Sequence, residues 1–133
     1  MQTEKEFLMK VESGELPLSE FNHTAHVKLG WIYLQNQPLP EALIQFRDSL
    51  KRFIALHGKS TLYHETITFA FMILIHERIQ IQSLDNPSWS QFAEANPDLI
   101  HHGKTILLKL YREETLFSVN AKTSFFLPDR LTS

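Results

Sequence analysis

Two histidines three residues apart open the segment of this sequence whose residue types are most suited to chemistry. His23 and His26 precede a nearly continuous apolar stretch, and Gly30 continues the same side of the predicted helix. Residues at spacings of three and four share one face of a helix, so we expect both imidazoles to face the interior. The partial positive charge of a helix N-terminus keeps such histidines neutral. Neutral imidazole is the form that binds a metal ion or accepts a proton.

A second group of polar residues lies in the segment LYHETIT, residues 62–68. His64 and Thr68 are four residues apart, and Glu65 and Thr68 are three apart, which places them together on the first turns of a helix. Tyr63 directly precedes this group. The segment therefore combines an imidazole, a carboxylate and hydroxyl groups near one helix end.

The expected topology brings the two groups together. Short connections make consecutive helices antiparallel, so the second and fourth helices should run parallel, with their N-termini at the same end of a bundle. Three imidazoles and a carboxylate suit a divalent transition metal, namely Zn, Fe, Mn or Ni. We therefore predict His23, His26 and His64 as metal ligands.

The same site, if it is catalytic, acts on a small organic molecule. Glu65 is then a fourth ligand or the general base, and Tyr63 and Thr68 are hydrogen-bond donors that assist it. A largely apolar pocket is expected around it, which favours a small molecule over a polymer. The residues predicted to line that pocket are Trp31, Tyr33 and Phe71.

The alternative is a non-catalytic module that binds a small ligand or a partner protein. Histidines among apolar residues are commonly core groups that hydrogen-bond to a backbone carbonyl or a hydroxyl. The remaining histidines favour this alternative reading. His57 is placed to cap a helix end, His76 is a core or surface polar residue, and His101 and His102 form a solvated first turn.

The spacing of apolar residues and capping residues predicts an all-α fold. We expect a compact bundle of about five to seven helices, forming a single domain over residues 1–133, with the second and fourth helices buried at its centre. The predicted helices run from Thr3 to Glu12, from Asn22 as N-cap to Gln35, from Pro40 to Gly58, from Leu62 to Gln82, from Ser88 onward, from Asn96 to Tyr111, and from Ser118 to before Phe125.

Composition narrows the class of protein. The chain has 133 residues, no cysteine and a formal net charge of -2. Disulfides, thiolate metal sites and cysteine nucleophiles are thereby excluded. The balanced charge gives no reason to expect binding to nucleic acid, and no apolar run predicts a membrane span or a signal peptide. We expect a soluble, cytoplasmic protein, with a homodimer left open because apolar helices can also pair between chains.

The two histidine segments also carry a resemblance. The stretches FNHTAHVKLGWIYL (residues 21–34) and LYHETIT, followed by Asn96–Leu99 and by Pro128 and Asp129, resemble a group of small, uncharacterised bacterial all-helical proteins. That group shows F-x-H-x-x-H and Y-H-E-T-x-T segments in the same order. The resemblance implies a helical fold over nearly the whole chain, and it implies no particular reaction.

Overall fold

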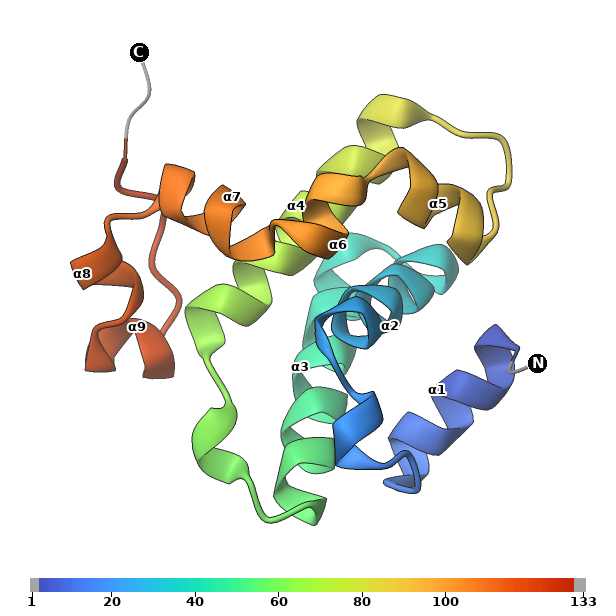
Figure 1. Cartoon of the computed structure of the whole chain (residues 1–133), viewed down its shortest axis with the longest axis horizontal. Helices are drawn as coiled ribbons and strands as arrows, with labels where there is room; N and C mark the ends of the chain where they lie inside the picture. Colours follow the sequence, from blue (N-terminus) through green and yellow to red (C-terminus); the bar gives the residue numbers. More distant parts are fainter. Residues whose placement is uncertain (1–2, 131–133) are drawn as a thin grey trace.

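The computed structural model describes residues 3–130, and the regular elements among them are all helical (Figure 1). The predicted all-α fold is confirmed. Two 3₁₀ turns lie at Leu18–Glu20 (η1) and Ser60–Leu62 (η2). The α-helices are α1 (Glu4–Ser13), α2 (His23–Asn36), α3 (Leu39–Leu56), α4 (Glu65–Gln82), α5 (Trp89–Ala95), α6 (Pro97–His101), α7 (Gly103–Leu110), α8 (Glu113–Leu116) and α9 (Val119–Thr123).

Helix ends fall where the capping residues of the sequence place them. The Asn22 side chain accepts a hydrogen bond from the backbone N–H of Ala25 at 2.9 Å and begins α2. Ser88 and Gln91 form a reciprocal capping box at the start of α5. At the end of α1, Gly14 adopts a φ of 81°, a left-handed conformation that glycine tolerates.

The core lies where α2 packs against α3 and α4. Leu29, Trp31, Phe46 and Met72 are buried there, which agrees with the predicted central position of the second and fourth helices. Gly30 permits the close approach of α2 and α4, because a Cβ at this position would lie only 2.8 Å from the sulfur of Met72. Side chains of α4, Met72 and Ile75, therefore occupy the space that a side chain at position 30 would take.

Polar contacts attach α6 to the second half of α4. Arg78 makes a bidentate ion pair with Asp98, with N–O distances of 2.9 and 2.6 Å. The side chain of Asn96, which is fully buried, bonds to Arg78 and exchanges two hydrogen bonds with Gln82. A buried amide with its partners present and a bidentate ion pair both fix geometry closely. These contacts set the position of residues 99–101, which border the site described below.

Two predicted helices differ from the structure. The expected helix from Asn96 to Tyr111 is interrupted at His102, whose φ of -133° and ψ of 35° are not helical, and α7 restarts at Gly103. The expected start at Leu62 is also wrong, because η2 precedes α4 and α4 begins only at Glu65. The helix α8 was not predicted from the sequence.

The C-terminal helices form one side of the molecule, at the left of Figure 1, opposite α1. Thr66, fully buried on α4, ties this part together. Its hydroxyl oxygen lies 2.7 Å from the Ala121 carbonyl oxygen and 2.8 Å from that of Ser124, and it accepts the N–H of Phe126 at 3.1 Å. Within residues 3–130, no helix has both the length and the apolar composition required to cross a membrane.

Candidate functional site

His64 is the N-cap residue of α4. Its Nδ1 accepts the backbone N–H of Ile67 at 3.1 Å, so the ring proton is on Nε2, which donates to the carbonyl of Leu116 at 2.8 Å. Burial lowers the pKa of His64, which favours this neutral form. Both ring nitrogens are therefore occupied within the protein.

His23, the first residue of α2, is held in a similar way. Its Nε2 lies 2.8 Å from the carbonyl oxygen of Leu99 and donates to it, since a carbonyl oxygen can only accept. The imidazole ring lies against the ring of Phe71, with 5.0 Å between centroids. Gly103 approaches so closely that a Cβ there would lie 2.7 Å from His23 Nε2. This contact explains why the helical backbone continues past His102 with a glycine.

His26 lies on the core side of α2, between two aromatic rings. Its ring centroid is 5.2 Å from that of Phe46, with the planes nearly stacked, and 5.7 Å from that of Phe21. The Nε2 atom is buried and has no hydrogen-bond partner among the described residues. Burial lowers the pKa of His26 to about 4, and the neighbouring His23 adds to the shift. His26 is thus a neutral, half-buried group whose Nε2 faces the core.

The structure does not bring the three histidines to one point. His23 meets α4 at Phe71, seven residues after His64, which corresponds to about 10 Å along a helix. The N-terminus of α2 therefore crosses the middle of α4 rather than its beginning. Among residues 3–130, no three His, Cys, Asp or Glu side chains are grouped so that they could hold a metal ion. The predicted histidine cluster is not supported, and metal binding itself stays a prediction.

The three residues predicted to take part in catalysis do lie together. The Tyr63 hydroxyl donates a short hydrogen bond to Glu65, and Arg47 Nη1 lies 4.0 Å from the same carboxylate. The hydroxyl of Thr68 donates to the carbonyl of His64 at 2.7 Å. Burial and the Glu65 carboxylate raise the pKa of Tyr63, so this phenol keeps its proton. These contacts join η2 to the start of α4, and a catalytic role stays a prediction.

The aromatic residues predicted to line a pocket are only partly in place. Trp31 and Tyr33 are each 2% exposed and belong to the core. Tyr33 shares a hydrogen bond of 2.7 Å with the hydroxyl of Ser49. Their assignment to the pocket is therefore wrong, whereas Phe71 does line a pocket.

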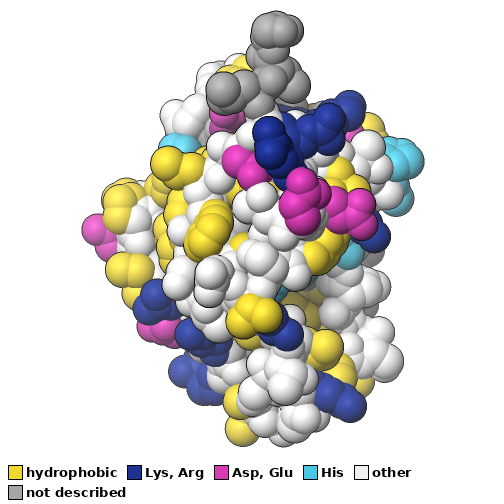
Figure 2. Space-filling model, turned by 90° about the vertical axis from the view of Figure 1, so that its left-hand side faces the viewer, with side chains coloured by type: hydrophobic (Ala, Val, Ile, Leu, Met, Phe, Trp, Pro, Cys, Tyr) yellow, Lys and Arg dark blue, Asp and Glu magenta, His cyan; other side chains and the backbone are white. Residues whose placement is uncertain are grey.

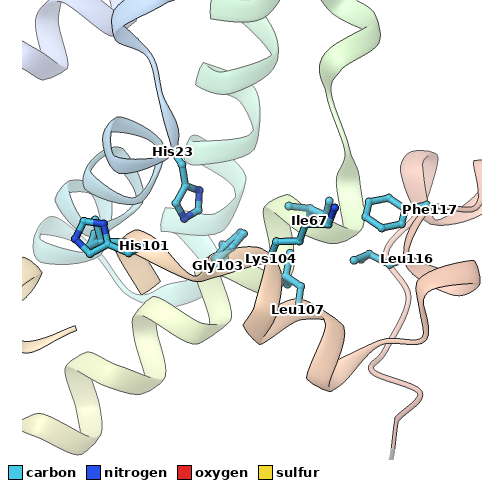
Figure 3. Close-up of a pocket in the computed structure, with 10 residues that line it drawn as sticks. His23, Ile67, His101, Gly103, Lys104, Leu107, Leu116 and Phe117 are labelled. Carbon is cyan, nitrogen blue, oxygen red and sulfur yellow. The ribbon is translucent and has the colours of Figure 1, made fainter. Parts of the chain in front are cut away.

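That pocket, called here the α4–α7 pocket, has a volume of about 480 Å³ (Figure 3). In the view of Figure 3, His23 and Gly103 lie near its middle, His101 at one end, and Leu116 and Phe117 at the other. Six apolar side chains supply most of its wall. The complete lining is His23, Ile67, Phe71, Ile100, His101, Gly103, Lys104, Leu107, Leu116 and Phe117.

The two histidine segments of the sequence both shape this pocket. His23 lines it directly, and its hydrogen bond to Leu99 fixes the residue next to lining residue Ile100. His64 lies behind the wall, where its two hydrogen bonds hold Ile67 and Leu116, both of which line the pocket. His23 and His64 therefore adjoin the same pocket.

Of the ten lining residues, sequence reasoning had named only His23 and Phe71 as part of a site, so eight were missed. Gly103 and Lys104 were not singled out, and His101 was assigned to a solvated turn. The signal available in the sequence was the glycine inside an otherwise helical segment, since such a glycine commonly marks a close approach of two elements.

The fold and the site together define a small all-α protein in which His23 and His64 help to shape a mainly apolar pocket. Comparison of the chain with protein-family models, with curated proteins and with solved structures gives no match. The resemblance to small bacterial helical proteins stays an interpretation of the sequence motifs.

Proposed function

We propose that this protein is a non-catalytic binding module that holds a small organic molecule in the α4–α7 pocket. The observation that carries the proposal is the lining itself, in which five helices from distant parts of the chain contribute a mainly apolar wall with a few nitrogen-bearing side chains. Ligand pockets in proteins have this composition and volumes of about 300–1,000 Å³.

Binding without catalysis fits the state of the candidate catalytic groups. His64 has both ring nitrogens in hydrogen bonds, and Glu65 and Thr68 each make a hydrogen bond within the protein, which supports a structural role for these residues. Their hydrogen bonds instead fix the start of α4, from which Ile67 and Phe71 enter the pocket. A cytoplasmic location belongs to the same proposal.

The test uses phenylnaphthylamine, an uncharged aromatic dye whose fluorescence rises in apolar surroundings. We expect saturable binding of one dye per chain, weakened roughly tenfold or more by Ile67→Trp, because the larger side chain occupies the pocket. The matched control is Ile73→Trp, on the same helix, 40% exposed and outside the lining. If Ile67→Trp binds the dye as tightly as Ile73→Trp, and both variants keep the near-UV circular dichroism of the native protein, the proposal is overturned.

A second measurement separates this proposal from a metal-dependent enzyme. Untagged protein, reconstituted in turn with Zn²⁺, Fe²⁺, Mn²⁺ and Ni²⁺, is analysed by plasma mass spectrometry beside the variant His23→Ala/His64→Ala. The binding module requires no bound metal. Near-stoichiometric metal that is lost in the folded variant would favour the metal-dependent enzyme instead.

A further inference from the structure

We infer that the ligand of the α4–α7 pocket is a small organic anion, with an apolar body against α4 and α7 and an acidic group held by Lys104. This inference rests on the proposed function and specifies the chemical class of the ligand. It is carried by the kinds of charge that line the pocket and by the position of the Lys104 side chain.

The ionisable residues that line the pocket all bear nitrogen. They are His23, His101 and Lys104, and no aspartate or glutamate belongs to the lining. The chain as a whole has more acidic than basic residues, 15 against 13. The lining thus has the opposite bias to the whole molecule. A cleft with charge of one sign and apolar walls concentrates ligands of the other sign.

Lys104 is placed to contact a ligand inside the pocket. Its Nζ lies 5.7 Å from the centre of the Phe117 ring, across the pocket from its own helix, and Figure 3 shows its side chain extending past Ile67. Within residues 3–130, the ion pairs found involve Arg47 and Arg78 and do not include Lys104. An ammonium group over an aromatic ring, without a carboxylate partner, can pair with an acidic group of a ligand.

The groups beside Lys104 also favour a negatively charged ligand. The Nε2 of His23 is already committed to Leu99, so this imidazole serves as a wall of the pocket rather than as an acceptor at that atom. His101 is exposed at the far end of the pocket and can donate an N–H. The start of α7 at Gly103, which has no side-chain cap, adds a partial positive charge beside Lys104.

The apolar part of the pocket determines the rest of the ligand. Ile67, Phe71, Leu107 and Leu116 give the pocket an apolar wall, which favours a ligand with a hydrocarbon body over a fully hydrated ion such as free phosphate. Figure 2 shows the side of the molecule that carries α8 and α9, where hydrophobic and charged side chains alternate over the surface. A ligand with a planar or branched hydrocarbon body and one carboxylate or sulfonate suits the pocket, because its body can contact the apolar wall while its acidic group pairs with Lys104.

The test compares two dyes with the same aromatic body. Anilinonaphthalene sulfonate carries an anionic group, and phenylnaphthylamine lacks it. We expect the sulfonate to bind roughly tenfold more tightly at low salt, and we expect this preference to disappear in Lys104→Gln. The matched control is Lys109→Gln, an exposed lysine on the same helix that does not line the pocket and should leave the preference unchanged.

The outcomes separate the two levels of the proposal. If both dyes bind equally and Lys104→Gln changes neither affinity, the inference about the anion is wrong and the binding pocket stands. If neither dye binds the native protein, or if Ile67→Trp changes neither affinity, the binding module itself is wrong. Lys104 is exposed, so the melting temperature of Lys104→Gln should match that of the native protein.

Discussion

His26 is expected to make the stability of the protein depend strongly on pH. The imidazole lies between the rings of Phe21 and Phe46, and its buried Nε2 has no hydrogen-bond partner within residues 3–130. Protonation in the native state therefore requires a charge in an apolar site. In the unfolded chain the same side chain is solvated and takes up a proton freely.

The magnitude follows from the two pKa values of His26. Its ordinary pKa is 6.5, and in the native protein it falls to about 4. Between these values the unfolded state binds more protons than the native state, so the free energy of unfolding decreases as the pH falls. Linkage then gives a loss of about 2 kcal/mol between pH ~7.5 and pH ~5, approaching ~3 kcal/mol well below pH ~4.

The assay is urea denaturation at a series of pH values for the native protein and for His26→Phe and His26→Leu. Both variants replace the titrating ring with an apolar side chain that the neighbouring aromatic rings can accommodate. We expect each to lose about 2 kcal/mol less than the native protein over the same pH range. His64, whose pKa is lowered by burial as well, contributes equally to all three proteins and cancels in the comparison.

A control variant separates titration from general weakening. Ile54→Val removes one methylene from the core and alters no titratable side chain, so it should lower stability at every pH by about 1 kcal/mol and keep the native pH slope. An unchanged slope in both His26 variants would refute the reasoning. So would an imidazole pKa near 6.5 for His26 in an NMR titration.

Substitutions at three further positions test contacts in and near the pocket, and each variant is measured by its midpoint of urea denaturation. Gly103→Ala should destabilise the fold by about 1–3 kcal/mol despite its better helix propensity, because the added Cβ would meet His23 at 2.7 Å; native stability would contradict this contact. Thr66→Val should cost about 1–3 kcal/mol, and Thr66→Ser should restore most of it, since the hydroxyl makes the hydrogen bonds of Thr66 to residues 121–126. His64→Ala should cost about 1–2 kcal/mol. His64→Asn should lose less, because asparagine can restore the helix cap but not the bond to Leu116. Equal losses for the two variants would show that the cap contributes nothing.

The helices could be predicted because their signals are local. Asn22 and Ser88 cap α2 and α5 as their positions indicate, and Gly14 ends α1. Capping, the missing N–H of proline and apolar spacing act within one turn of the chain, so the sequence alone contains them. The short α8 escaped prediction because four residues are too few to show a periodic pattern.

The arrangement of the candidate site could not be predicted to the same extent. Antiparallel connectivity suggested that the N-termini of α2 and α4 would meet, but connectivity fixes neither the crossing angle nor the level at which two helices touch. That level is determined by packing, here by Gly30 against Met72 and by His23 against Phe71. The break at His102 was missed for the same reason, since it depends on the contact of Gly103 with α2.

The histidines illustrate how one sequence pattern supports two kinds of site. Neutral imidazoles near helix N-termini are suited to metal binding, and a neutral imidazole can also form hydrogen bonds with backbone groups. The second use is what the structure contains, because Leu99 and Leu116 supply carbonyl acceptors at 2.8 Å to His23 and His64. Each of these bonds joins segments far apart in the chain, and each adjoins the α4–α7 pocket. Substituting either histidine should therefore change ligand binding through the shape of the pocket, and it should do so whether or not a metal is present.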